Sequence, residues 1–269
     1  VYATAFPIPA AMASTWDLDL LNKVGVAMGA ESKAFGVDVL LGPAFNIKRD
    51  PLNGRNFEYL TEDPYLNGRL AAAIVKGIQS EGVGVSIKHF AVNNQETNRM
   101  SINEVVSERA LREIYLSAFE YVVKNSDPWT VMSSYPKING THGAQNKYLL
   151  TDILKNEWKF NGLVMSDWFA VKDAVAAVNA GNDLIMPGGP KWGGQGDTSD
   201  DVLAGLKNGT IKEADIDKNI KNILKIVLKS LSFKGDLPTN KPDLKANVEI
   251  VRKTAAEGMV LLKNEKTLP

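Results

Sequence analysis

Gly162-Leu163-Val164-Met165-Ser166-Asp167-Trp168 is the most informative stretch of the chain for its fold. A short apolar run bounded by glycine ends in a hydroxyl, a carboxylate and an indole, a pattern typical of a parallel strand buried on both faces. In α/β folds ligands bind at the carboxyl ends of such strands, so the stretch predicts that Asp167 faces a pocket. The alternative is that Asp167 caps a helix beginning near Phe169, because aspartate is a favoured N-cap residue.

The same pattern recurs along the chain and predicts an α/β fold. Four other apolar segments end in polar or turn residues: 37–41, 83–87, 130–132 and 183–186. Helical patterns alternate with them at about 17–35, 63–81, 104–125, 147–158 and 170–180, and two more helices are expected over 199–231. Strands alternating with helices predict a parallel sheet with right-handed crossovers. Because the sequence has no Gly-x-Gly-x-x-Gly turn opening a helix and no Walker motif, a TIM-like (β/α)8 barrel is favoured over an open sheet.

The pattern changes toward the end of the chain. Residues 1–233 are predicted to form the barrel, and 234–247, rich in Gly, Pro, Asn and Lys, to form a linker. Residues 248–269 read as one helix followed by a strand-like segment at 259–262. A strand without partners is unstable, so a second domain is expected to begin there. The first residue is Val1 rather than methionine, and we therefore expect the native start to lie elsewhere.

Composition narrows the classes of function. The chain has 269 residues, of which 44% are hydrophobic, enough for a sizeable core and a soluble globular protein. Lys plus Arg equals Asp plus Glu at 31 each, so no nucleic-acid or anionic-membrane partner is indicated. Without cysteine there is no thiolate chemistry, and two histidines argue against a His-rich metal centre. With no membrane span or signal peptide in the sequence, the cytoplasm, the periplasm and secretion all stay open.

Polar residues crowd at the ends of the predicted strands. They are Arg55, Lys88, His89, Arg99, Tyr135, Asp167 and Trp168. In a barrel these strand ends converge on one mouth. Donors of the Arg, Lys and His type bind hydroxyl groups and an indole offers an apolar platform, which suits an uncharged sugar. The cations are also expected to keep Asp167 ionised, as a nucleophile requires.

Arg55 and Lys88 have other interpretations, and one group of carboxylates could suggest a metal site. Arg55 and Glu58 can be a solvated ion pair on a turn, because such pairs are common and weak. Lys88 can form a Schiff base in a lyase if burial lowers its pKa, although its polar neighbours argue against such a shift. The carboxylates Asp50, Glu58 and Glu62 lack metal-loop spacing and indicate surface or capping positions.

Several blocks of the sequence resemble one known family. The run Ile153-Leu154-Lys155-Asn156-Glu157, four residues, and then Gly162 to Ala170 resembles the nucleophile signature of glycoside hydrolase family three. Further blocks follow the family's order: Asn53-Gly54-Arg55-Asn56-Phe57-Glu58, Lys88-His89-Phe90, Ser107-Glu108-Arg109-Ala110-Leu111-Arg112-Glu113 and Ala180-Gly181-Asn182-Asp183-Leu184-Ile185-Met186-Pro187-Gly188. The resemblance covers essentially the whole chain.

The resemblance implies both an activity and a set of roles. The activity is retaining hydrolysis of terminal non-reducing β-D-glucosyl residues, with a covalent glycosyl-enzyme intermediate on Asp167. Arg55, Lys88, His89 and Arg99 would bind sugar hydroxyls, Tyr135 would lie beside the nucleophile, and Trp168 would form an apolar wall. No metal and no cofactor are implied. The expected ligand is a β-glucoside or a related oligosaccharide, and neither glucose over xylose nor the linkage follows from the sequence.

The chain departs from the family pattern at both ends. It begins beyond the family's Asp-Gly-Pro block, so we expect the barrel to lack its first strand and helix. The general acid/base glutamate normally comes from a second α/β sandwich domain, and Glu257-Gly258-Met259-Val260-Leu261-Leu262-Lys263-Asn264 looks like the opening of that domain. A second polypeptide carrying the sandwich domain and this glutamate is therefore a candidate partner. The alternative function is a non-catalytic sugar-binding or assembly fragment that needs such a chain.

One branch of the family is disfavoured by the sequence. The branch that hydrolyses N-acetylglucosaminides keeps a His-Asp dyad on the loop after Lys-His-Phe. This chain has Ala91-Val92-Asn93-Asn94 at that place. We therefore expect the β-glucosidase type of reaction.

Overall fold

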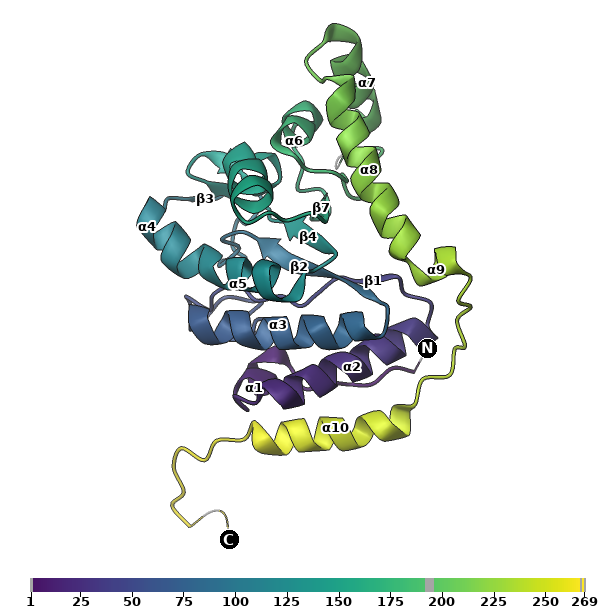
Figure 1. The fold of residues 1–269 in the computed structure, drawn as a ribbon. Helices are drawn as coiled ribbons and strands as arrows, with labels where there is room; N and C mark the ends of the chain where they lie inside the picture. The colour runs from purple at the N-terminus through teal and green to yellow at the C-terminus, as the bar shows by residue number, and fades with distance from the viewer. Residues whose placement is uncertain (1, 192–195, 267, 269) are drawn as a thin grey trace.

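The computed structural model describes residues 2–191, 196–266 and 268, which form an α/β fold around a parallel sheet (Figure 1). The sheet has the strand order β1-β2-β4-β7, with β1 at Val39–Leu40, β2 at Gly84–Phe90, β4 at Thr130–Ser133 and β7 at Leu163–Ser166. A second, small sheet joins β3 (Asn103–Glu104), β5 (Lys137–Ile138) and β6 (Thr141–His142). The predicted α/β class with a parallel sheet is confirmed.

Helices occupy the predicted crossovers, with two π-helical segments among them. The elements are α1 (Pro9–Ala13), α2 (Leu18–Ala34), α3 (Pro64–Ser80), α4 (Glu108–Ala110), the π-helix η1 (Leu111–Leu116), α5 (Ser117–Ser126), the short 3-10 helix η2 (Gly143–Gln145), the π-helix η3 (Tyr148–Glu157), α6 (Ala174–Ala180), α7 (Thr198–Asn208), α8 (Glu213–Lys229), α9 (Leu231–Lys234) and α10 (Leu244–Glu257). The helix predicted over 170–180 begins later, at Ala174.

One predicted strand is much shorter than expected. Residues 183–186 do run beside β7, but they make only one parallel bridge, between Met165 and Leu184. The bridge consists of the Leu184 N–H donating to the Val164 carbonyl at 3.0 Å and the Ser166 N–H donating to the Leu184 carbonyl at 2.9 Å. Beyond it, the Met186 N–H donates to Ser166 Oγ at 2.8 Å rather than to a backbone carbonyl. Within the described residues the hydrogen-bonded sheet is open, with β1 at one edge and the Leu184 bridge at the other.

Aspartate caps and close glycine contacts explain the two longest helices on one side of the sheet, α2 and α3 (Figure 1). Asp17 accepts from the Leu20 N–H at the start of α2, and Asp63 accepts from two N–H groups at the start of α3. The helices approach so closely that a Cβ on Gly77 would lie 2.2 Å from the Asn22 carbonyl oxygen. Only glycine fits this crossing.

The central strands are buried on both faces, which confines polar side chains to their ends. Val85 and Ile87 of β2, Val131 of β4 and Val164 of β7 are fully buried. The sequence of a strand that is covered on both faces is continuously apolar and does not alternate between apolar and polar residues. Polar groups that follow it can reach solvent only beyond the last paired residue, and this geometry positions the candidate site.

A buried carboxylate holds β7 to its neighbours. Asp183 accepts hydrogen bonds from Lys155 Nζ of η3 at 2.8 Å, from the Val164 N–H of β7 at 2.8 Å and from Asn222 Nδ2 of α8 at 3.1 Å. Its side chain is fully buried. One carboxylate therefore links the strand that precedes Asp167 to two helices.

The C-terminal part of the chain differs from its prediction in two places. The helix α10 begins at Leu244, inside the expected linker, and Asn247 Nδ2 donates to Glu31 Oε2 of α2 at 2.8 Å and to Thr4 Oγ1 at 2.9 Å. Residues 259–262 are described and form no strand there, and all four side chains are at least 64% exposed. The division at 234–247 and 248–269 stays a prediction. In the described part of the chain, no helix is long and apolar enough to cross a membrane.

Candidate active site

The carboxyl ends of the strands bring the predicted residues together. Lys88 and His89 lie at the end of β2, Tyr135 follows β4 by two residues, and Asp167 follows β7 directly. Arg55 and Arg99 come from the loops after β1 and β2. The capping alternative for Asp167 is wrong, because α6 begins at Ala174 and its cap is Asp173, which accepts from the Ala176 N–H at 2.9 Å.

The Asp167 carboxylate is largely buried and hydrogen-bonded. One oxygen accepts from the Trp168 N–H at 2.7 Å, the Tyr135 hydroxyl donates to the carboxylate, and Oδ2 lies 3.6 Å from His89 Nε2. Burial raises the pKa of Asp167, while these hydrogen bonds, Arg55 and Lys88 work in the opposite direction. Arg55 and Lys88 lie near Asp167, as the sequence predicted. Burial nevertheless raises the pKa of Asp167 by more than these two cations lower it.

Arg55 is the centre of a charged network rather than a solvated turn pair. Its guanidinium contacts Glu58 through Nε and lies 3.8 Å from Glu96 Oε1. Glu58 also lies 3.9 Å from Lys88 Nζ, and Glu96 accepts from Arg99 at 2.7 Å. The side chains of Arg55 and Glu58 are only 20% and 21% exposed. The solvated-pair interpretation is therefore wrong, and the pair belongs to the wall of the site.

Arg99 also covers an aromatic ring of the site. Its guanidinium carbon lies 4.6 Å from the centroid of the Tyr135 ring, within the range of a cation–π contact. Burial, and then the nearby Asp167 carboxylate, raise the pKa of Tyr135, so its hydroxyl stays protonated and can donate. Arg99 and Tyr135 thus form one side of the mouth around Asp167.

His89 is buried and neutral, and its partners define its tautomer. Arg55 can only donate, so His89 Nε2, 3.1 Å from Arg55 Nη2, is an acceptor. The proton therefore lies on Nδ1, which donates to the Tyr59 hydroxyl oxygen at 3.3 Å. Burial first, and then Arg55, Lys88 and Arg99, hold the pKa of His89 well below its usual value. The 3.6 Å approach of Asp167 to His89 is consequently not an ion pair.

The pKa of Lys88 corrects one expectation. Burial lowers the pKa of Lys88, although Glu58 and Asp167 act to raise it, and the sequence argument that polar neighbours prevent such a shift was wrong. Its side chain is 17% exposed and lies beside both carboxylates. Lys88 Nζ thus lies 3.9 Å from Glu58 Oε2 and is influenced by the charge of Asp167, a position suited to a hydroxyl donor.

Four residues of the site were not identified from the sequence: Asn46, Glu58, Tyr59 and Glu96. Asn46 holds the His89 backbone on both sides, accepting from its N–H at 2.8 Å and donating to its carbonyl at 2.9 Å. Tyr59 donates to the Asn93 carbonyl at 3.2 Å, while Asn93 Nδ2 donates back to the Tyr59 oxygen at 3.0 Å. Glu96 could have been found from the sequence, because it lies in the crowded polar run 93–99. Tyr59 could not, because the irregular loop 41–63 has no periodicity that would single it out.

Replacing Tyr59 with phenylalanine is expected to lower stability by about 1–3 kcal/mol, because the buried His89 Nδ1–H then has no acceptor. Thermal denaturation of the complete protein measures this loss. Tyr65→Phe is a matched control, since Tyr65 is 66% exposed. Equal melting temperatures for the two variants would show that the buried hydrogen bonds of Tyr59 with His89 and Asn93 do not stabilise the fold.

In the described ranges 2–191, 196–266 and 268, no group of three or more His, Asp or Glu side chains is placed to hold a metal ion. The family model for the glycosyl hydrolase family 3 N terminal domain matches residues 1–226. The chain belongs to glycosyl hydrolase family 3.

Relatives within family 3 are similar over the full chain. The thermostable beta-glucosidase B of Acetivibrio thermocellus is 48% identical over 98% of this chain, and an exo-alpha-(1->6)-L-arabinopyranosidase of Bifidobacterium longum is 46% identical over 100%. The solved structure of beta-glucosidase 3B from Thermotoga neapolitana in complex with glucose is 52% identical and superposes with a TM-score of 0.96, covering 100% of this chain and 38% of that one. The barrel-type fold predicted from the sequence agrees with this match.

The chain spans about a third of the length of the curated relatives that it matches, 34% in both cases. Each of these relatives is a single longer chain. These relatives therefore give no support to the second polypeptide considered as a candidate partner from the sequence.

Proposed function

We propose that the complete protein hydrolyses terminal non-reducing β-D-glucosyl residues with retention of configuration, and that Asp167 is its nucleophile. The observation that carries the proposal is the buried Asp167 carboxylate at the end of β7, surrounded by Arg55, Lys88 and Tyr135. Relatives named beta-glucosidase at 48% and 52% identity support the same reaction.

The chemistry proceeds in two displacements. Asp167 attacks the anomeric carbon, the bond from that carbon to the aglycone oxygen breaks, and a glycosyl ester of Asp167 forms. A second carboxyl group protonates the departing oxygen, then takes a proton from the water that hydrolyses the ester. In retaining enzymes the two carboxyl groups lie about 5–5.5 Å apart. We propose that this acid/base comes from a part of the complete protein outside residues 1–269, in an α/β sandwich domain.

The other side chains bind the sugar and shape the transition state. Arg55, Lys88 and Arg99 donate hydrogen bonds to hydroxyl groups, and such bonds stabilise the oxocarbenium-like transition state if they strengthen as the ring distorts. His89 acts by orienting Arg55 toward the sugar, because its Nε2 accepts from Arg55 Nη2 while its proton lies on Nδ1. Trp168, which is 50% exposed beside the nucleophile, provides the apolar wall.

The sugar specificity is tested with three aryl glycosides. A family relative is named for α-(1→6)-L-arabinopyranosides, so 4-nitrophenyl β-D-glucoside should be compared with the β-D-xyloside and the α-L-arabinopyranoside. We expect the glucoside to have the largest kcat/KM. Proton NMR of the first product formed should show the β-anomer of glucose, and initial release of the α-anomer would refute retention.

The pH dependence should reveal the raised pKa of Asp167. The nucleophile must be ionised, so kcat/KM falls as the pH drops through that pKa. Because burial raises the pKa, we expect the acid limb to have its midpoint above the value of about 3.9 that is usual for aspartate. Tyr135→Phe removes a hydrogen bond that favours the ionised carboxylate, so the midpoint should move further upward. A midpoint at or below the usual value would contradict the assignment.

The alternative function is a sugar-binding or assembly subunit without turnover of its own. Loss of general acid catalysis costs about 10²- to 10⁴-fold in rate, most visibly on unactivated substrates. Cellobiose hydrolysis by the complete protein at ordinary enzymatic rates would exclude this alternative. Sugar binding without hydrolysis would favour it.

A further inference from the structure

A lysine-rich hollow of about 650 Å³ lies at the amino end of β7, at the opposite end of the strand from Asp167. Five lysines line it: Lys147, Lys155, Lys218, Lys221 and Lys225. Among the described residues only two carboxylates line it, and each already binds a lysine, because Asp183 accepts from Lys155 at 2.8 Å and Asp215 accepts from Lys218 at 3.0 Å. The hollow therefore carries an excess of positive charge, which stabilises any negative charge that forms at its wall.

The pair Asn161-Gly162 lies on the wall of this hollow, directly before β7. Lys225 Nζ of α8 donates to Asn161 Oδ1 at 2.7 Å. Asn161 is exposed, and the Gly162 N–H has no hydrogen-bond acceptor among the described residues. In an Asn-Gly pair the backbone nitrogen of the glycine can approach the amide carbon of the asparagine side chain, because glycine has no side chain to hinder it.

Four other Asn-Gly pairs in the chain lack one or more of these features. They are Asn53-Gly54, Asn67-Gly68, Asn139-Gly140 and Asn208-Gly209. The first two asparagines are buried, and the second of them lies inside α3. In the third pair the side-chain amide bonds Val106 at 2.9 Å through both of its polar atoms, and the glycine N–H donates to Asn103 Oδ1 at 2.7 Å. In the fourth pair, where the asparagine is exposed, the glycine N–H donates to the Leu206 carbonyl at 3.3 Å.

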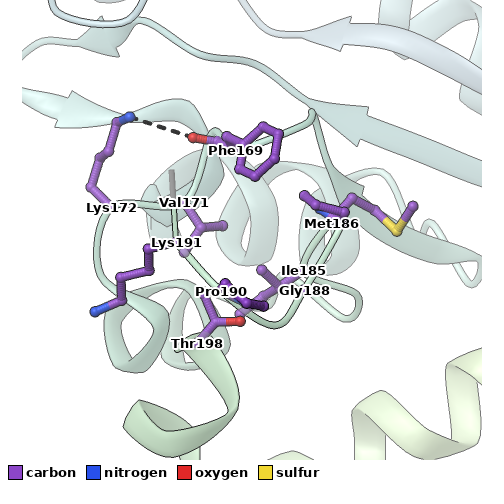
Figure 2. A pocket seen from close by; sticks show the side chains of 10 residues that line it. Phe169, Val171, Lys172, Ile185, Met186, Gly188, Pro190, Lys191 and Thr198 are labelled. Carbon is purple, nitrogen blue, oxygen red and sulfur yellow. Dashed lines mark hydrogen bonds between the residues drawn. The ribbon is translucent and has the colours of Figure 1, made fainter. Parts of the chain in front are cut away.

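A lysine beside a hollow is not sufficient for this arrangement. Another lysine-bearing hollow lies after β7, where Lys172 Nζ contacts the Phe169 carbonyl at 3.4 Å (Figure 2). No asparagine lines that hollow in the part of the chain that the structure describes. Its lysines therefore have no side-chain amide to act on, whereas Lys225 contacts one directly.

We propose that Asn161 is a site of spontaneous deamidation, in which Gly162 provides the nucleophile and Lys225 stabilises the negative charge. The Gly162 nitrogen loses its proton to solvent and bonds Cγ of Asn161, which places a negative charge on Oδ1, the atom that Lys225 contacts. The bond from Cγ to Nδ2 then breaks, and this nitrogen takes a proton from solvent and leaves as ammonia. Water opens the resulting cyclic imide at either carbonyl, which yields aspartate or isoaspartate.

The two products differ in their effect on β7. Isoaspartate adds one carbon to the backbone two residues before β7 begins, close to the bond in which the Leu163 N–H donates to the Trp129 carbonyl at 3.1 Å. Aspartate leaves the backbone unchanged and gives Lys225 a carboxylate partner. Deamidation to isoaspartate therefore disturbs the start of the strand that carries Asp167.

Peptide mapping by mass spectrometry measures deamidation at all the Asn-Gly pairs in one sample. The complete protein is incubated for days in mildly alkaline buffer and then digested. We expect Asn161 to be modified about two- to tenfold faster than Asn208, because the glycine N–H after Asn208 must first lose a hydrogen bond. Isoaspartate should be among the products, since direct hydrolysis of the side-chain amide by water gives aspartate alone.

Lys225→Met tests the role of the cation. We expect modification of Asn161 to slow by about two- to fivefold, the factor that an exposed charge contributes to a rate. Lys76→Met removes an exposed lysine of α3 outside the lining and is the matched control, which should keep the wild-type rate. Modification of Asn161 no faster than that of Asn208, products without isoaspartate, or a rate in Lys225→Met equal to or above that of the wild type would each overturn the proposal. Because the measurement does not require turnover, its result is independent of the proposed function.

Discussion

Replacing Asp167 with alanine in the complete protein is expected to lower kcat/KM for 4-nitrophenyl β-D-glucoside by on the order of 10⁴- to 10⁶-fold, as removal of hydrolase triad residues does. The reason is that no other carboxylate among the described residues directly follows a central strand at this mouth. Initial-rate kinetics measures the loss. Azide should partly restore turnover and give the α-glucosyl azide, because it attacks the face that Asp167 has vacated.

Asp173 provides a matched control for this substitution. It lies six residues further along the chain, caps α6 and takes no part in the site. Asp173→Ala should cost about 1 kcal/mol of stability and leave kcat/KM nearly unchanged. Near-wild-type activity of Asp167→Ala, or azide products with β configuration, would show that Asp167 is not the nucleophile.

Stability measurements on Asp167→Asn separate chemistry from folding. Burial raises the pKa of Asp167 in the folded state, so the folded protein binds a proton that the unfolded chain has already lost. Wild-type stability contributed by this group therefore falls as the pH rises through the interval between the two pKa values. The asparagine variant avoids that loss, so its stability relative to the wild type should increase with pH over the same interval. The opposite trend would contradict the burial argument.

The parts of the fold that could be predicted from the sequence are those governed by burial. Val164 and its neighbours read as a strand because both faces of β7 are covered, and Asp167 follows the last paired residue. Residues 184–186 are equally apolar, yet the preceding Asp183 side chain bonds the Val164 N–H, and only Leu184 makes a bridge. A pattern of residue types does not show which backbone groups a side chain will hydrogen-bond.

The candidate site shows the same limit. The strand-end residues Lys88, His89 and Asp167 could be placed because topology alone brings them together. Tyr59 and Asn46 could not, since both lie on irregular backbone and act through hydrogen bonds to His89, one between Tyr59 and its ring and two between Asn46 and its backbone. The pKa of Asp167 was expected to follow the surrounding charges, but desolvation depends on side chains from several elements and exceeds their effect.

Removing the Asp183 carboxylate is expected to be the most destabilising single substitution among the charged residues discussed. Asp183→Ala leaves Lys155, 20% exposed, without its carboxylate partner, and it deprives the Val164 N–H of an acceptor. Breaking a buried ion pair by removing one partner costs about 3–5 kcal/mol. For a domain of this size, the melting temperature should fall by on the order of 10 °C. Differential scanning calorimetry of the complete protein measures the change.

Two further variants distinguish the buried pair from the general effect of losing a charge. Asp215→Ala removes the partner of Lys218, which is 73% exposed, and such surface pairs contribute about 0–1 kcal/mol. Adding Lys155→Met to Asp183→Ala removes the uncompensated cation, so the double variant should recover part of the lost stability. Because β7 carries Asp167 at its end, Asp183→Ala should also lower kcat, although the Asp183 side chain is fully buried and is not one of the proposed sugar-binding residues. A melting temperature no lower than that of Asp215→Ala would show that β7 does not depend on this carboxylate.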